Sequence, residues 1–487
     1  MSSITEHTAC IIGGGMSGLI TGALLAKNGY SVTVLEKNHI IGGGLQSFRR
    51  GDAVFNTGMQ AFCGYDKEFA LYHLFRYFDF KENDTLRIVP LDKDAQELVW
   101  TDSYHCYRLP KTRKQYESYL ISQFPHQSEG IHRLLNDIYE IGNTFDYFRL
   151  HPMQRHEEAA KYAIITARQL LGRHLTDDRL IQLFEYVGMH LGYNLSVLPA
   201  TELGMILNLY IEGGWRLAGG NFYLTDQLVS VIEKNKGNVL RNAEVCEVTT
   251  ENKKVNQVKT TDGRKFNADI YICAMPPSPF VHMLTDNDIL RFSTFERIKD
   301  FRNDSSCCIC HIRLKANKFK YLNHLIFIPT PTQDNHLPHY ISMLTPPGKD
   351  QDEWAHTVEI LQFFKYEDFT QWENTQTGRR GLDYEQMKDS IAQKIIDYVS
   401  IYYPELKPAV DKVYLSTPLT IRDYYNNPLG AAYSQQGLFI PIKTKANNLF
   451  MTGQAVQYQG LFGVATTSIA TAETILGNSL IEEIKQA

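Results

Sequence analysis

Three glycines and one acidic residue near the start of the chain have the types and spacing needed to bind a dinucleotide. Gly13 permits a tight turn, Gly15 lets the backbone approach a pyrophosphate without an intervening Cβ, and Gly18 allows close helix packing. The N-terminus of that helix offers free N–H groups and a partial positive charge to phosphate oxygens. Glu36 is placed to accept hydrogen bonds from both hydroxyls of an adenosine ribose.

The elements that must position these residues are visible in the sequence. Residues 8–12 predict a strand, the segment 19–26 predicts an apolar helix, and residues 32–35 predict a second strand that Glu36 closes. Gly29 marks the end of the helix. Strand, turn, helix, strand and acid thus occur in the order of a βαβ unit, which makes the glycine pattern far more specific than it is alone.

Further motifs bear on whether the dinucleotide is FAD or NAD. Lys37 and the glycines 42–44 follow Glu36, and the segments 55–60, 213–269 and 450–464 carry more glycine-containing motifs. In these features the chain resembles the flavin amine oxidase and phytoene desaturase superfamily, whose members use them to hold FAD from its ribose to its isoalloxazine ring. The resemblance implies that FAD is bound by Gly13, Gly15, Met16, Ser17, Gly18, Glu36, Lys37, Gly42, Gly43, Gly44, Gly58, Met59, Gln60, Val245, Gly453, Gln454, Gly463 and Val464.

One branch of this superfamily is particularly similar. The segments 417–418 and 422–425, with Pro428, Gly430 and Tyr433, resemble a stretch that precedes the last flavin motif in carotenoid desaturases, carotenoid isomerases and retinol saturases. The resemblance implies an FAD-dependent oxidoreductase that desaturates, saturates or isomerises carbon–carbon double bonds of an apolar polyene or isoprenoid. It also implies an elongated apolar tunnel beside the flavin.

The chain departs from the family pattern at three polar positions. Gln454 replaces the usual Asp of the last motif, while Asn56 and Gln60 replace an acid and a histidine of an earlier one. Amides keep hydrogen-bonding capacity but carry no charge, so FAD binding is expected to survive these changes. Tyr433 and Gln454, on either side of the last flavin strand, are the catalytic candidates. His190, a lone histidine in a helical region, is interpreted as structural.

Composition excludes several other classes of protein. The 487 residues carry a formal net charge of −5, so the basic excess typical of nucleic-acid binding is missing. The cysteines at 307, 308 and 310 have no second ligand pair at a metal-binding spacing, and no metal is expected. Aromatic residues reach 12%, which suits an apolar cavity as well as a large core.

No membrane-spanning or secretory segment is expected. The sequence has no uncharged apolar run of about 18 residues, and the first residues lack a basic start followed by an apolar stretch. The predicted location is cytoplasmic, with peripheral membrane contact as a further expectation.

The remaining pattern predicts a discontinuous two-domain α/β fold. Residues 115–210 favour helices, whereas 245–274 and 307–364 favour strands, and a helix is expected over 384–403 and another over 467–476. We predict a Rossmann-type FAD-binding domain of the glutathione-reductase class and a mixed-sheet and helical substrate domain. The FAD-binding domain comprises residues 1–75, 215–285 and 445–487, and the substrate domain comprises 76–214 and 286–444.

The electron partner and two alternative functions stay open at this point. No second dinucleotide fingerprint is visible, so an oxidation must deliver its electrons by another route, such as to oxygen or a quinone. A reduction needs an external donor, and an isomerisation needs no net electron transfer. An amine oxidase acting on a C–N bond would share this fold. So would a non-catalytic prenyl- or lipid-binding protein, although the intact glycine motifs argue against it.

Overall fold

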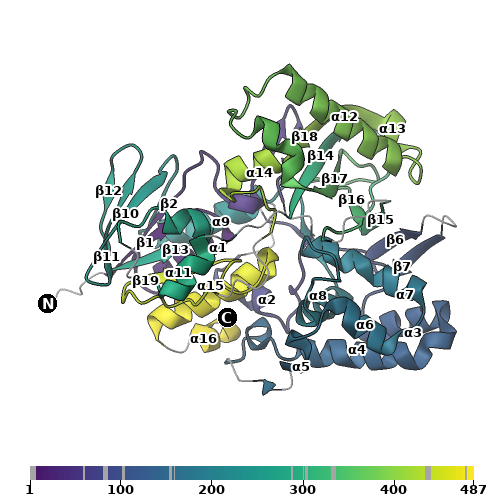
Figure 1. Ribbon diagram of the computed structural model, residues 1–487, viewed down its shortest axis with the longest axis horizontal. Helices are drawn as coiled ribbons and strands as arrows, with labels where there is room; N and C mark the ends of the chain where they lie inside the picture. The colour runs from purple at the N-terminus through teal and green to yellow at the C-terminus, as the bar shows by residue number, and fades with distance from the viewer. Residues whose placement is uncertain are drawn as a thin grey trace.

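A five-stranded parallel sheet forms the centre of the lobe that carries the N-terminus in Figure 1. Its strands, in spatial order, are β19 (Leu449–Met451), β13 (Ile270–Cys273), β1 (Thr8–Ile12), β2 (Ser31–Leu35) and β9 (Asn238–Leu240). The computed structural model describes residues 7–58, 61–80, 86–100, 105–152, 156–157, 160–286, 289–299, 301, 305–330, 336–433, 440–477 and 480–487.

The predicted βαβ unit is confirmed. Strands β1 and β2 are parallel, with Ile12 opposite Leu35, so Gly13 and Glu36 leave the sheet at the same edge. Helix α1 (Met16–Lys27) connects them and is buried from Met16 to Ala26. It is apolar on all sides because it packs against both α9 (Phe222–Lys234) and α15 (Gly460–Leu476).

A seven-stranded mixed sheet forms the second lobe (Figure 1). In spatial order its strands are β18 (Val410–Ser416), β14 (Ser306–Leu314), β17 (Thr357–Phe364), β16 (Tyr340–Leu344), β15 (Leu325–Pro329), β6 (Gln96–Trp100) and β7 (His105–Leu109). Near β6 and β7 lies a helical layer: α3 (Arg113–Gln123), α4 (Ser128–Gly142), α5 (Ala160–Ala163), α6 (Ala167–His174), α7 (Asp178–Leu183), the 3-10 helix η5 (Phe184–His190) and α8 (Ala200–Glu212). The predicted helical region 115–210 is therefore confirmed.

Smaller elements complete the chain. They are the hairpin β3 (Ser47–Arg50) and β4 (Ala53–Asn56), the pair β5 (Ile88–Pro90) and β8 (Trp215–Leu217), the sheet β10 (Val245–Glu251), β11 (Lys254–Thr260) and β12 (Lys265–Phe266), and the helices α2 (Ala70–Tyr77), α10 (Pro277–Val281), α11 (Phe292–Lys299), α12 (Leu382–Val399), α13 (Leu406–Ala409), α14 (Pro418–Tyr425) and α16 (Leu480–Gln486). Some predicted boundaries were wrong: α15 begins at Gly460 rather than Thr467, and α12 ends at Val399 rather than Tyr403.

Each large sheet draws its strands from only one set of predicted domain segments. The strands of the five-stranded sheet all fall within 1–75, 215–285 and 445–487, and those of the seven-stranded sheet all fall within 76–214 and 286–444. This partition is what a discontinuous two-domain chain requires, although the division between the domains stays a prediction.

Asn56, the residue that replaces the family's acid, is a buried junction between four elements. Its Oδ1 accepts hydrogen bonds from Ser47 Oγ at 2.8 Å and from the backbone N–H of Asn221 at 3.0 Å. Its own backbone N–H donates to Glu359 Oε1 on β17 at 2.7 Å. A neutral amide suits this position because the buried Glu359 carboxylate already lies beside it.

This junction predicts that Asn56→Asp destabilises the protein. A second carboxylate next to Glu359 is expected to lower the free energy of unfolding by a few kcal/mol, since two like charges about 4 Å apart repel by about 4 kcal/mol at an effective dielectric of about 20. Urea denaturation of the single variant and of Asn56→Asp/Glu359→Gln measures this repulsion, since removing the Glu359 charge should restore most of the stability. Equal destabilisation in both variants would contradict the charge argument.

Candidate flavin and substrate cavity

In the first glycine-rich turn, Gly13, Gly15 and Gly18 are each required for a different physical reason. Gly13 has φ of +111°, a conformation that L side chains rarely adopt. A Cβ on Gly18 would lie 2.0 Å from the Gly13 carbonyl oxygen, so the helix packs directly on the turn. A Cβ on Gly15 would point into the cavity, with Gly43 Cα as its nearest neighbour at 3.9 Å. Only Gly15 therefore leaves open space that a ligand can fill.

Glu36 lies at the same edge of the sheet, with its carboxylate in the cavity wall. Its Oε2 accepts a hydrogen bond from the Gly14 N–H at 2.9 Å, and Oε1 accepts one from the Asn38 N–H at 2.8 Å. Burial raises the pKa of the Glu36 carboxyl, and these two hydrogen bonds partly oppose that rise. Each oxygen keeps a further lone pair, so the carboxylate can still accept hydroxyl groups of a ligand.

A second glycine segment runs beside the first. Gly42 donates its N–H to the Gly14 carbonyl at 2.9 Å and has φ of +121°. A Cβ on Gly43 would lie 3.1 Å from Gly15 Cα, and one on Gly58 would lie 2.4 Å from the Gly44 carbonyl oxygen. Three backbone segments thus meet without side chains between them and form a cradle in which N–H groups can contact phosphate oxygens.

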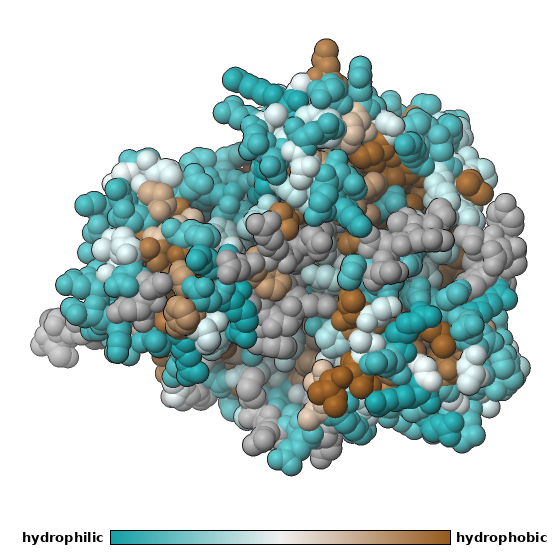
Figure 2. Space-filling model, viewed as in Figure 1, coloured by the Kyte–Doolittle hydropathy of each residue, from teal (hydrophilic) through white to brown (hydrophobic). Residues whose placement is uncertain are grey.

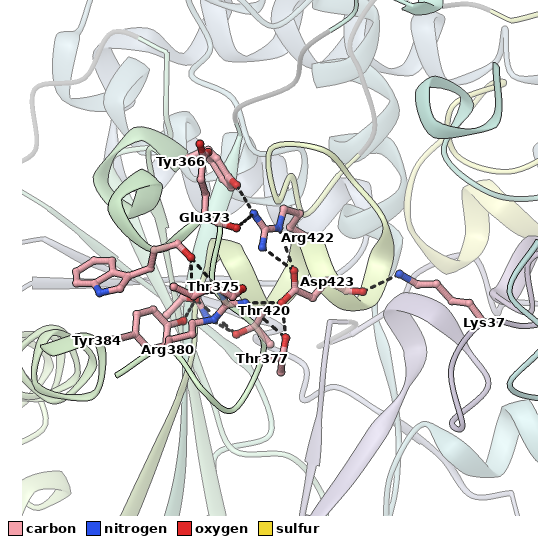
Figure 3. A network of polar contacts seen from close by, with 12 residues as sticks. Lys37, Tyr366, Glu373, Thr375, Thr377, Arg380, Tyr384, Thr420, Arg422 and Asp423 are labelled. Carbon is pink, nitrogen blue, oxygen red and sulfur yellow. Dashed lines mark hydrogen bonds and ion pairs between the residues drawn. The ribbon is translucent and has the colours of Figure 1, made fainter. Parts of the chain in front are cut away.

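Lys37 and Asn38 connect this cradle to α14. Lys37 Nζ donates to the carbonyl of Asp423 at 2.7 Å, and Asn38 Nδ2 donates to the carbonyl of Tyr424 at 3.0 Å. Figure 3 shows the Lys37 contact together with Arg422 and Arg380, which both bind the Asp423 carboxylate. Burial lowers the pKa of Lys37. These contacts cap the C-terminal end of α14 with positive charge and hydrogen-bond donors.

The last motif closes the opposite side of the cavity. Gly453 follows β19 with φ of +100°, and a Cβ there would lie 2.9 Å from Ser17 Oγ. Gly463 lies in the first turn of α15, which has no acidic residue, and a Cβ on it would lie 2.7 Å from the carbonyl carbon of Tyr458. The N-terminus of this helix therefore faces the cavity with its partial positive charge uncompensated by a local acid.

One cavity of about 370 Å³ joins these motifs to the second lobe. Met59 and Gln60 lie outside the described residues, and Gly18 contributes packing rather than cavity surface. The other predicted site residues line the cavity: Gly13, Gly15, Met16, Ser17, Glu36, Lys37, Gly42, Gly43, Gly44, Gly58, Val245, Tyr433, Gly453, Gln454, Gly463 and Val464.

The cavity has a charged end and an apolar end. Among the described residues that line it, the charged ones are Glu36, Lys37 and Glu244, and the last two interact electrostatically. The second lobe contributes mainly apolar and aromatic side chains instead: Met189, Leu191, Met205, Ile206, Leu209, Tyr210, Ile309, Leu325, Phe327 and Leu361. This end can enclose an apolar molecule but offers no partner for a buried charge.

Several wall residues could not be found from the sequence. Tyr210, Phe327 and Leu361 come from helix and strand positions that look like ordinary core. Tyr425 donates its hydroxyl to the Thr57 carbonyl at 2.9 Å and lies against Gly44. The tyrosine-rich motif at 424–425 and Tyr433 was a usable signal, since these tyrosines and Tyr458 all line the cavity.

Comparison with known proteins agrees with this geometry. Residues 16–318, well over half of the chain, match the family described as flavin containing amine oxidoreductase, and the chain belongs to that family. It is an FAD-dependent oxidoreductase with an α/β FAD-binding fold. A solved oxidoreductase from Methanosarcina mazei shares this fold, with a TM-score of 0.68 at 15% identity over 96% of this chain and 100% of that one.

Two curated relatives are similar to this chain over nearly its whole length. The chain is 23% identical to an all-trans-retinol 13,14-reductase of Danio rerio, over 97% of this chain and 86% of the relative. It is 24% identical to a chloroplastic prolycopene isomerase 1 of an Oncidium hybrid cultivar, over 98% of this chain and 85% of the relative. Both similarities extend over almost the full chain, as the resemblance to the desaturase and saturase branch implies.

Gly15→Ala is expected to separate folding from cofactor binding. The added Cβ meets no protein atom closer than 3.9 Å but enters the space proposed for the pyrophosphate, so FAD affinity should fall at least about tenfold while the fold persists. Gly172→Ala is the matched control, because a Cβ there has no atom within 4 Å. Flavin titration and thermal denaturation measure the two effects, and undiminished FAD affinity in Gly15→Ala would remove the pyrophosphate from this turn.

Proposed function

We propose that this oxidoreductase desaturates, saturates or isomerises carbon–carbon double bonds of an apolar polyene or isoprenoid. The observation that carries the proposal is the apolar end of the cavity, whose described wall has no charged side chain. Enclosing a long apolar molecule there is favourable by roughly 25 cal/mol per Å² of apolar area removed from water. The names of the relatives, a retinol reductase and a carotenoid isomerase, support the same substrate class.

The proposed FAD position follows the polarity of the cavity. The ribose lies at Glu36, the pyrophosphate at Gly15 and the glycines 42–44, the adenine beside Val245, and the isoalloxazine near the N-terminus of α15. Bound FAD supplies the hydride or electron transfer. The helix N-terminus stabilises negative charge at the pyrimidine edge of the ring.

Tyr433 and Gln454 are the proposed residues at the reactive face. Tyr433 stacks on Phe363 with ring centroids 6.3 Å apart and donates its hydroxyl to the Met189 carbonyl at 3.4 Å. Burial raises the pKa of the Tyr433 phenol well above its usual range, which keeps it protonated at neutral pH. The proposed role of both residues is to position the substrate and to exclude water.

The wall also bears on the amine oxidase alternative. Among the described residues, the one lysine in the cavity wall is Lys37, at the end where Glu36 lies. Its ammonium group is bound to the Asp423 carbonyl. No feature of the apolar end therefore favours a C–N substrate, and the electron donor or acceptor is proposed to be an external partner.

Anaerobic turnover tests the proposed chemistry and its direction. Enzyme with oxidised FAD and enzyme reduced with dithionite are each incubated with β-carotene or retinol in liposomes, and with putrescine as the amine. If oxidised enzyme loses its flavin colour and the product has a new double bond, the reaction is a desaturation. If reduced enzyme regains its flavin colour and the product has lost a double bond, the reaction is a saturation. A change of double-bond geometry alone indicates isomerisation. Bleaching by putrescine with no polyene product would overturn the proposal in favour of an amine oxidase.

Peripheral membrane contact is proposed through an exposed apolar patch. No helix in the described part of the chain is long and apolar enough to cross a bilayer. Ile164 and Val197 are 85% and 37% exposed, on two segments joined by hydrogen bonds such as that from the Ala200 N–H to the Ile165 carbonyl. Figure 2 shows apolar side chains exposed in this region of α5 and α6.

Ile164→Glu is expected to weaken vesicle binding several-fold without changing stability, because an exposed side chain contributes little to folding. Leu382→Glu is the matched control, since Leu382 is 82% exposed on α12, in another part of the fold. Sedimentation with phosphatidylcholine vesicles measures the difference. Equal losses in both variants, or no loss in either, would argue against a membrane-facing role for this patch.

A further inference from the structure

His190, interpreted from the sequence as a structural histidine, lies in the wall of the apolar end of the cavity. Three aromatic rings from three different elements enclose it. Its ring stacks on Tyr210 with centroids 4.2 Å apart and an interplanar angle of 29°. Phe327 and Tyr186 contact it edge-on, with centroids 5.6 Å and 6.2 Å away. The imidazole is therefore held in one place, with part of its surface facing the cavity.

The imidazole carries a hydrogen-bonding atom that the protein does not satisfy. Nε2 is enclosed and has no hydrogen-bond partner among the described residues. Burial lowers the pKa of His190 to about 3, so the ring is neutral at physiological pH, with one donor and one acceptor nitrogen. A buried polar atom without a hydrogen-bond partner is unfavourable. A phenylalanine would fill the space between these three rings without leaving a polar atom unsatisfied.

The surroundings of His190 restrict what its partner can be. Tyr433 directs its hydroxyl to the Met189 carbonyl, next in the chain to His190. The described wall near His190 contains no cation, so a carboxylate would be buried there without a counter-charge. A hydroxyl group can donate to the imidazole and a carbonyl group can accept from it, and neither needs charge compensation.

We propose that His190 binds a terminal hydroxyl or carbonyl oxygen of the substrate, which makes the substrate an oxygenated polyene rather than a hydrocarbon or an acid. This inference rests on the proposed function and refines it. A long apolar rod without a polar end can slide along an apolar wall. A hydrogen bond at one end fixes its register, and His190 is thus a positioning residue that selects which double bond reaches the flavin.

Paired ligands test the inference. Retinol is compared with its deoxy hydrocarbon and with retinoic acid, and zeaxanthin is compared with β-carotene, by equilibrium binding to the FAD-loaded protein. The wild-type protein should bind at least one alcohol about tenfold more tightly than its hydrocarbon and should disfavour the acid. His190→Phe, which keeps an aromatic ring beside Tyr210, should lose this preference while keeping hydrocarbon affinity. His73→Phe, the same substitution at a histidine on α2 outside the cavity wall, should retain it.

Product analysis adds a readout that a purely structural role would not change. With His190→Phe, conversion of the alcohol should spread over several double bonds, whereas the wild-type protein and His73→Phe should act at one position. Hydrocarbon conversion without any alcohol preference in the wild-type protein would overturn this inference but leave the proposed function standing. Failure of every polyene to bind would overturn both, and the wild-type comparison holds even if His190→Phe does not fold.

Discussion

The close approach between the Gly13 carbonyl and Gly18 is the constraint on which the rest of the site depends. A Cβ at residue 18 would lie 2.0 Å from that oxygen, so only glycine lets α1 begin directly on the edge of the sheet. This contact aims the helix N-terminus into the cavity. It also leaves room for Gly42 and Gly43 beside Gly15 and for Gly453 beside Ser17. The cradle is therefore built from backbone, which can contact a cofactor closely because no side chains intervene.

Polar contacts connect this cradle to the second lobe. Lys37 and Asn38, directly after β2, bind the last carbonyls of α14, and Asn56 joins the glycine-rich segments to Glu359 on the seven-stranded sheet. Such contacts are directional, so they fix the relative position of the two lobes more narrowly than apolar packing would. These hydrogen bonds between the lobes therefore help to set the distance between the walls of the cavity.

The charged and the apolar residues of the cavity lie at opposite ends. Glu36, Lys37 and Glu244 lie at one end, where they face each other or backbone groups, while the other end is aromatic and aliphatic. Burying a charge without a partner is costly, so an apolar wall selects uncharged substrates. His190 fits this arrangement because its imidazole stays neutral and offers hydrogen bonds without adding charge.

Much of the FAD-binding part could be predicted from the sequence, because its determinants are local. The turn at Gly13–Gly15, the helix after it and the acid at 36 lie within one short segment, and steric rules assign each glycine its place. The strands at 245–273 and the helices between 115 and 210 followed from periodicity in the same way. The start of α15 was missed because its first turn, Gly460–Gly463, contains two glycines, which favour loops in isolation but here allow close packing on Tyr458.

The positions of the cavity-wall residues of the second lobe were decided by tertiary structure alone. His190, Tyr210 and Phe327 lie on η5, α8 and β15, and no sequence spacing shows that their rings form one box in a cavity wall. Likewise, the sequence showed only that Asn56 replaces an acid of the family pattern, whereas the fold makes it a neutral junction beside Glu359. By itself, the sequence determined the flavin-binding framework, since that depends on backbone sterics between neighbouring residues. The substrate end depends on side chains that are far apart in the sequence, and only folding brings them together.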